Sequence, residues 1–206
     1  ISSMRIIHRF DLQGFDVVNG INYEGLRPVG KVNDLITAWG RNRIDEIFFQ
    51  GALTSLHNTF IEYQIVKIAK EMLLRPITVG GGIKDLTTAQ KLIAQGADRI
   101  AINSALFENK ELLNELISTL GVSTVVISID VSLIGNNYFC FTNNGRENTK
   151  VKLDDYLTTL QSVGGPEIIL TNIDRDGTCR GLDLDLLDIL KFHQGPIIYS
   201  GGISNI

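Results

Sequence analysis

Two aspartates of this chain are placed to do acid–base chemistry. Asp11 and Asp130 each follow an apolar-rich run, and they stand about 120 residues apart, at the spacing of an internal repeat. When two carboxylates occupy equivalent positions, different surroundings can make one a general acid and the other a general base. The alternative is that each carboxylate only caps the loop or helix that follows it.

Glycine-rich turns recur at the same spacing and form a second candidate site. The turn Gly80–Gly82 is repeated as Ser200–Gly202, and each turn follows an apolar run. Backbone N–H groups of such turns bind anions, and the N-terminus of a following helix adds a favourable dipole. Asn103 and Ser104 offer a further amide and hydroxyl after another apolar run. The pattern predicts a phosphate site in each half, unless the glycines only form tight turns.

A polar loop and four spaced charges complete the candidate residues. In the loop Asp174–Thr178, Gly177 could present its N–H group to a ligand, while Asp174 and Asp176 could bind hydroxyl groups. The alternative is an ion-paired loop in solvent. Four charged residues at or near the starts of predicted strands could form a closed ring of ion pairs: Arg5, Glu46, Arg99 and Glu167. Such a ring, opposite the active site of a barrel, is typical of a stabilising role.

The elements that must position these residues alternate between strand and helix. Short apolar runs predict strands at residues 5–10, 45–49, 76–80, 98–102, 124–129, 167–171 and 196–199. Segments with helical periodicity are residues 32–39, 60–74, 87–94, 110–120, 153–161 and 184–192. One interruption, Asn136–Gly145, is bounded by turn residues and predicts a β-hairpin insertion.

The alternation and the repeat together predict an α/β fold, a (β/α)8 TIM barrel made of two half-barrel repeats. We expect a single domain over residues 1–206, with repeats at about 1–120 and 121–206, the second one incomplete. The eighth βα unit is expected to be missing from this sequence, because two full repeats need about 240 residues. A doubly wound open sheet is the second choice.

Composition excludes several classes of protein. A net charge of −4 argues against a nucleic-acid binder that relies on a positive field. No apolar run is long enough for a membrane span, and no signal peptide is evident, so we expect a cytoplasmic protein. The two cysteines, Cys140 and Cys179, and the three histidines lack metal-ligand spacing, which gives no basis for a metal or an organic cofactor.

From Arg5 to Ile206 the chain resembles the cyclase subunits of imidazole glycerol phosphate synthase. Besides the two aspartates, the matching motifs are Gly20–Arg27, Thr78–Ile83, Ala97–Asn103 and Ile168–Thr178. The sister isomerase of the histidine pathway shares the barrel and the paired aspartates. The Gly20–Arg27 motif, the predicted hairpin and the four-charge ring favour the cyclase family.

The resemblance implies an enzyme of histidine biosynthesis. In that family, ammonia joins a bisphosphate aminoimidazole-carboxamide ribonucleotide, an imidazole ring closes and two products leave. Asp11 and Asp130 would be the acid–base pair. The residues implied to bind phosphate or substrate are Gly82, Asn103, Ser104, Thr171, Asp176, Gly177 and Gly202. The four-charge ring would be a gate that admits ammonia from a glutaminase subunit docked at the N-terminal barrel face, as a heterodimer.

Several residues depart from the pattern of the resembled family. Asn19 replaces a lysine of the first loop, and Gly51 replaces an aspartate at the end of a strand. Arg9 and Phe10 stand where a cysteine and a leucine precede the first aspartate. Arg99 replaces a gate lysine, and Asn144 replaces a smaller residue. The loss of a cation at position 19 and of a carboxylate at position 51 is expected to weaken substrate binding.

These departures leave a second function open. In it, the protein is a paralogue that keeps the barrel, the glutaminase dock and the ammonia conduit, and serves a sugar-amidating enzyme of surface polysaccharide synthesis. The retained aspartates and phosphate turns favour the cyclase instead. The sister isomerase, which needs no ammonia, is the third choice.

Overall fold

The computed structural model describes residues 5–22, 24–39, 44–51 and 58–203. Its contacts divide the chain into two compact units, one of residues 1–19 and 27–101 and one of residues 20–26 and 102–206. Most of each predicted repeat therefore falls into a unit of its own. The prediction that the repeats make up one domain stays a prediction.

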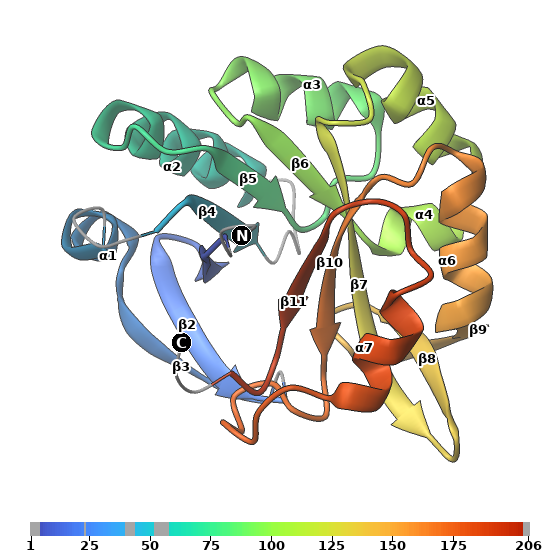
Figure 1. The fold of residues 1–206 in the computed structure, drawn as a ribbon. Coiled ribbons are helices and arrows are strands. Elements are labelled where there is room, and N and C mark those ends of the chain that lie inside the picture. Colours follow the sequence, from blue (N-terminus) through green and yellow to red (C-terminus); the bar gives the residue numbers. More distant parts are fainter. Residues whose placement is uncertain (1–4, 23, 40–43, 52–57, 204–206) are drawn as a thin grey trace. The chain divides into compact units, whose positions relative to one another are not determined.

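The first unit is a set of parallel strands joined by helices. β4 pairs with β1 and β5, and β5 also pairs with β6, all in parallel. These strands are β1 (Ile7–Gln13), β4 (Glu46–Gly51), β5 (Ile77–Gly80) and β6 (Arg99–Ile102). Figure 1 shows the helices of this unit: α1 (Val32–Trp39), α2 (Asn58–Met72) and α3 (Leu86–Ala94).

Burial on both faces explains why these strands are continuous apolar runs. Ile47, Phe48 and Phe49 are adjacent in β4 and point alternately to opposite faces, yet none is more than 2% exposed. Helix α3 begins at a side-chain cap, because the backbone N–H of Thr88 donates to the Asp85 carboxylate at 2.7 Å. The apolar runs thus form the buried strands, and the capping aspartate sets the start of α3.

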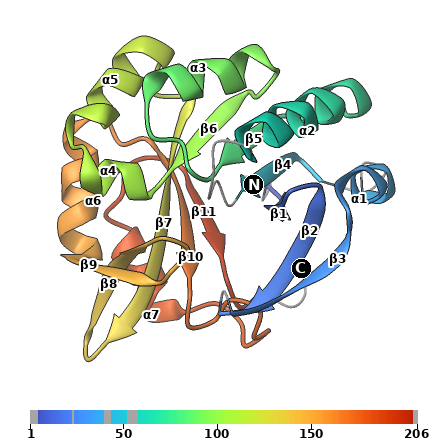
Figure 2. The ribbon, with the colours of Figure 1, turned by 180° about the vertical axis from the view of Figure 1, so that it is seen from behind.

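The second unit repeats the same parallel order. β10 (Glu167–Asn172) pairs in parallel with β7 (Val125–Ile134) and with β11 (Ile197–Ser200). Its helices, seen from behind in Figure 2, are α4 (Ser104–Glu108), α5 (Glu111–Leu120), α6 (Leu153–Ser162) and α7 (Leu184–Leu190). The sequence did not predict α4, because five residues are too few to show a helical period.

Each unit has an antiparallel excursion after its first strand. β7 pairs with β8 (Asn137–Thr142), and β8 pairs with β9 (Glu147–Lys152), which confirms the predicted hairpin insertion. In the first half of the chain, β1 pairs antiparallel with β2 (Asp16–Ile21), and β3 (Glu24–Lys31) follows. The sequence predicts a loop here and no strand. Its polar and glycine residues hid the strands, which backbone pairing sets rather than apolar alternation.

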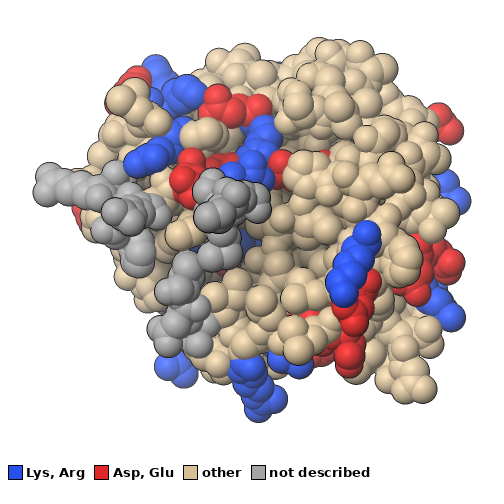
Figure 3. All heavy atoms as spheres, in the orientation of Figure 1, with Lys and Arg blue, Asp and Glu red and all other residues tan. Residues whose placement is uncertain are grey.

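The α/β class and all seven predicted parallel strands are confirmed, with ends that shift by a few residues. The predicted ends of the first and fifth strands were wrong: Asp11 and Asp130 lie inside β1 and β7, because both strands continue into antiparallel pairs. Basic and acidic side chains are interspersed on the face drawn in Figure 3. Within the described residues, no helix is both long and apolar enough to cross a membrane.

Candidate active site

Asp11 lies beside an arginine of its own strand. Because side chains alternate along β1, Arg9 and Asp11 share one face. Nε and Nη2 of Arg9 each lie 2.8 Å from Oδ1 of Asp11, and the Asp11 side chain is 36% exposed. The Arg9 guanidinium also lies over the Phe48 ring, with Cζ 5.7 Å from the ring centroid. The first aspartate is therefore a carboxylate held by a cation.

Asp130 has a different environment. It is only 5% exposed, and Nδ2 of Asn103 donates to its Oδ2 at 2.9 Å. Its register partner on β10 is Thr171, which is fully buried on the same face of the sheet. A buried carboxylate beside an amide and a hydroxyl is suited to take and return a proton. The predicted substrate residues Asn103 and Thr171 thus surround the second aspartate.

The hairpin of the second unit makes hydrogen bonds with Asn103 and Ser104, the two residues predicted to hold phosphate after β6. Asn103 precedes α4 but makes no side-chain cap, because its amide is directed to Asp130 and, at 3.4 Å, to the carbonyl of Phe141. The Ser104 hydroxyl accepts the backbone N–H of Asn143 at 3.1 Å. Asn103 is therefore a neighbour of the catalytic candidate, and its phosphate role stays a prediction.

The glycine turns are required by the backbone in both units. Gly81 has a φ of +101° and Gly201 a φ of +105°, in the region that favours glycine. A Cβ on Gly81 would lie 1.7 Å from the carbonyl oxygen of Gly51, and one on Gly201 would lie 2.7 Å from that of Asn172. These two glycines occupy equivalent positions of the repeat. Each lets its turn approach the end of the neighbouring parallel strand, which is β4 for Gly81 and β10 for Gly201.

The last glycine of each turn has a left-handed φ, +61° at Gly82 and +84° at Gly202. Gly202 lies against a loop of its own unit: the N–H of Gly181 donates to its carbonyl at 2.7 Å. A Cβ there would lie 2.3 Å from the carbonyl oxygen of Gly181. Gly82 belongs to the first unit and Gly202 to the second, and anion binding by either stays a prediction.

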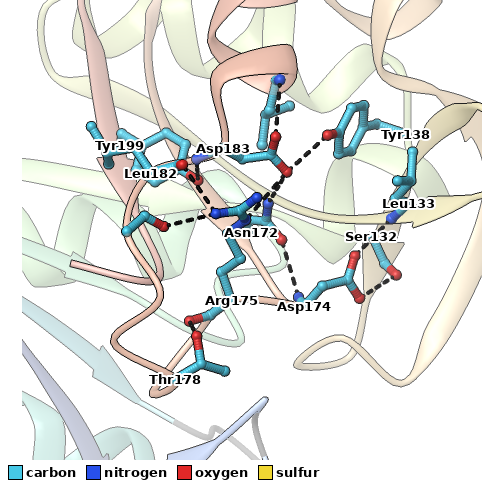
Figure 4. Close-up of polar contacts among 12 residues, drawn as sticks. Ser132, Leu133, Tyr138, Asn172, Asp174, Arg175, Thr178, Leu182, Asp183 and Tyr199 are labelled. Carbon is cyan, nitrogen blue, oxygen red and sulfur yellow. Dashed lines mark hydrogen bonds and ion pairs between the residues drawn. The ribbon is translucent and has the colours of Figure 1, made fainter. Parts of the chain in front are cut away.

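A buried polar network holds the loop after β10 (Figure 4). Its centre is Asp183, which is 8% exposed and accepts hydrogen bonds from Nδ2 of Asn172 at 2.9 Å and the hydroxyl of Tyr138 at 2.8 Å. Nε of Arg175 lies 3.6 Å from the same carboxylate. Sequence reasoning missed Asp183, although its position directly before α7 marks it as a helix cap.

The loop's first aspartate contacts the hairpin. Asp174 accepts the hydroxyl of Ser132 and the backbone N–H of Leu133, each at 2.8 Å. Each of its carboxylate oxygens therefore has a partner within the protein, and binding of substrate hydroxyl groups by Asp174 stays a prediction. Arg175 donates to the carbonyls of Gly181 and Leu182. The alternative of an ion-paired loop therefore fits Arg175, which pairs with Asp183, whereas the partners of Asp174 are neutral hydrogen-bond donors.

Two motifs that sequence analysis singled out lie against each other. The backbone N–H of Asn22 donates to the carbonyl of Asp176 at 2.9 Å. A Cβ on Gly177, whose φ is +70°, would lie 2.5 Å from the carbonyl oxygen of Gly20. The segment Gly20–Leu26 therefore packs on the loop after β10, and Gly177 has to be glycine for that approach. Ligand binding by Asp176 and Gly177 stays a prediction.

Three of the four predicted gate residues form an ion cluster in the first unit. Glu46 is 2% exposed and contacts the guanidinium of Arg99 directly. Its Oε1 accepts the hydroxyl of Thr78 at 2.5 Å, and Nη1 of Arg5 lies 3.9 Å from its Oε2, the oxygen that contacts Arg99. Glu167 begins β10 in the second unit. Its place in a ring with the other three, and any gate function, stay predictions.

Burial shapes the titration of the side chains near Asp130 and Asp183. Burial, with a further contribution from the Asp130 carboxylate, raises the pKa of the Cys140 thiol to about 12. Burial and the hydrogen bond to Asp183 raise the pKa of Tyr138 well above its usual value. Both groups are therefore neutral at physiological pH. Within the described residues, no three His, Cys, Asp or Glu side chains gather as a metal site would require.

The structure explains some of the departures from the resembled pattern. Asn144 has a φ of +56° in the turn between β8 and β9, a conformation that asparagine tolerates better than most residues. Gly51 lies at the close contact with Gly81. Arg9 pairs with Asp11, two positions along the same strand. Nothing in the structure explains Asn19, which is exposed in β2.

The chain is similar to known proteins of histidine biosynthesis. A family model described as "Histidine biosynthesis protein" matches residues 5–206. A Legionella pneumophila protein named imidazole glycerol phosphate synthase subunit HisF is 35% identical over 208 residues, covering 100% of this chain and 98% of that protein. Proteins of the same name from Sulfolobus acidocaldarius and Thermotoga sp. are 35% and 36% identical, covering 100% and 96% of this chain and 83% and 79% of theirs.

Proposed function

The chain belongs to the histidine biosynthesis protein family, and from that premise we propose that it is the cyclase subunit of an imidazole glycerol phosphate synthase. Its substrates would be ammonia and a bisphosphate aminoimidazole-carboxamide ribonucleotide. The observation that carries the proposal is the equivalent placement of Asp11 and Asp130. Each lies in the first strand of its unit, where a parallel strand turns into an antiparallel excursion.

The two aspartates are suited to different parts of the reaction. Addition of ammonia and closure of the imidazole ring need a group that removes protons and a group that delivers them. Asp130, buried beside Asn103, is the better candidate to exchange a proton with substrate, because few water molecules can compete there. Asp11, held by Arg9, would orient or stabilise a positive group of substrate.

The turns at Gly82 and Gly202 would bind the two phosphates of the ligand, with help from Ser104 and Gly177. Support comes from the left-handed φ at Gly82, Gly177 and Gly202, a conformation in which glycine allows close approach of the backbone to a ligand. Thr171 and Asp176 would complete the substrate site in the second unit.

A glutaminase subunit is the proposed source of ammonia. The curated relatives are named as subunits of a synthase, which supports a partner protein. The cluster of Arg5, Glu46 and Arg99, with Glu167, would form the gate at the N-terminal ends of the strands, opposite the aspartates. A cytoplasmic location remains the expectation from the sequence.

The test is ammonia-dependent turnover of the bisphosphate ribonucleotide by the purified protein, followed by absorbance. We expect turnover in the unmodified protein and its loss in Asp11→Asn and Asp130→Asn, with Asp188→Asn as a control for an exposed aspartate outside the site. If the folded protein shows no turnover, the cyclase proposal fails. Glutamine hydrolysis by an added glutaminase subunit, measured with and without this protein, would then separate a partner function from catalysis.

A further inference from the structure

Arg9 and Phe48 occupy the face of the first unit's sheet that also carries Asp11. In the register of β1 and β4, Arg9 lies opposite Phe48 and Asp11 lies opposite Gln50. Side chains two residues apart on one strand point to the same face, so these four residues form two adjacent rows. One row holds the ion-pair cation and the ring beneath it, and the other holds the carboxylate.

The ion pair is asymmetric. Nε and Nη2 of Arg9 both reach Oδ1 of Asp11, at 2.8 Å each. Within the described part of the chain, these are the side-chain contacts of the Asp11 carboxylate, and both fall on Oδ1. The neighbouring Gln50 has a buried Oε1 without a hydrogen-bond partner in the described part of the chain, and as an acceptor this oxygen cannot bind the carboxylate. Oδ2 is therefore the oxygen that can meet a substrate.

The cation lies deeper than the carboxylate it holds. The Arg9 side chain is 18% exposed and the Asp11 side chain 36%. The guanidinium is fixed from a second direction by the ring of Phe48, which is 2% exposed. A planar group held by a ring on one side and a carboxylate on the other has little freedom, so it can fix the direction in which Asp11 points.

We propose that Arg9 is a positioning residue for the reaction, which clamps one oxygen of Asp11 and directs the other at substrate. The proposal deepens the proposed function and rests on it. Arginine stays protonated at all accessible pH values, so the clamp persists wherever the enzyme works. Lysine cannot replace it fully, because a single ammonium lacks the two converging N–H groups.

The experiment replaces Arg9 and restores its head group from solution. We expect Arg9→Ala to lower kcat about 10- to 100-fold, because a misplaced catalytic group costs rates of that order, with KM changed less than about twofold. Millimolar ethylguanidinium should recover part of the lost kcat, and ethylammonium, which has the charge without the fork, should not. Arg9→Lys should recover less than ethylguanidinium does. Lys31→Ala, which breaks the exposed pair with Asp16, is the matched control and should keep full turnover.

Three results would overturn the positioning role. One is a raised KM with unchanged kcat, which would make Arg9 a substrate-binding residue. Another is an unchanged kcat and KM. The third is equal rescue by ethylguanidinium and ethylammonium, which would reduce Arg9 to a charge.

Failure of the proposed function is distinguishable, because it shows as absent turnover in the unmodified protein. The hold of Arg9 on Asp11 is then measured by urea unfolding of Arg9→Ala, Asp11→Asn and the double variant. Changes in midpoint that are not additive support the clamp, and additive changes overturn it.

Discussion

The two units place an aspartate at the same point of the same topology and give it opposite surroundings. In the first unit, Asp11 is part exposed and meets a guanidinium of its own strand. In the second, Asp130 is buried and meets the amide of Asn103. A duplicated backbone therefore fixes where a carboxylate stands, while one neighbouring side chain decides its partner. Under the proposed function, that difference would give two identical residues two roles.

The largest expected effect separates the two carboxylates directly. Asp130→Asn should lower kcat by about 10²- to 10⁴-fold, the usual contribution of a group that transfers a proton. Asp11→Asn should cost less, because the amide keeps an oxygen for Arg9 and loses only charge. Steady-state rates with saturating ammonia measure both. An equal loss in the two variants, or a larger loss in Asp11→Asn, would contradict the assignment of different roles.

A second prediction compares the glycine turns. Gly81→Ala should destabilise by about 3 kcal/mol or more, because its Cβ would overlap the carbonyl oxygen of Gly51 at 1.7 Å. Gly201→Ala, at 2.7 Å from a carbonyl oxygen, should cost about 1 to 3 kcal/mol. Gly121→Ala is the control for backbone strain alone, since its φ is +87° and nothing lies near its Cβ. Urea unfolding gives the order, and equal losses at the first two positions would show that the turns relax alike.

A third change removes the partner of the buried aspartate. Asn103→Ala leaves Asp130 without its amide donor, so we expect a loss of about 1 to 3 kcal/mol in the free energy of unfolding. Asn109→Ala, which removes an exposed side-chain acceptor for the Glu111 N–H, is the matched control and should cost less. If Asn103→Ala costs the same with Asp130→Asn present as without it, the two side chains are not coupled.

The smallest effect is a pH dependence confined to the first unit. Burial lowers the pKa of His8 below its ordinary value of 6.5, and the residue about 120 positions later is the apolar Ile127. Above pH 6.5 both folded and unfolded chains carry a neutral ring, so His8 has no effect. As the pH falls below that value, the unfolded chain binds the proton more readily, and stability decreases. His8→Ile should flatten this part of the urea midpoint curve measured between about pH 5 and 8, and an unchanged curve would exclude His8 as its cause.

The fold could be predicted because its signals are local. Runs such as Val125–Ile129 are mostly apolar and buried on both faces, and the repeat aligns them with their counterparts, so the parallel strands could be found from the sequence. The excursion β2–β3 could not be predicted in this way. Its side chains are largely polar or exposed, and backbone pairing with β1 holds its first strand.

In the candidate site, too, the residues with a local signal could be predicted and their contacts could not. Asp11, Asp130 and the glycine turns were found from their spacing alone. Their partners were harder to find, because a side-chain contact such as Asn103 with Asp130 joins residues 27 positions apart. The clamp of Asp11 by Arg9 spans two positions and was available in principle from strand alternation. Asp183, at the centre of the network with Tyr138, depends on contacts among three elements and left only a helix-cap signal.

The membership of Gly20–Leu26 in the second unit has a consequence for inheritance. The segment is encoded in the first half of the gene, yet it covers Gly177 in a loop of the other half. Recombination that exchanged one half for a homologue's would bring in a foreign segment against a native loop, with a carbonyl oxygen 2.5 Å from the place of a Cβ. A change in either of these two segments, which lie in different halves of the sequence, therefore has to be tolerated by the other.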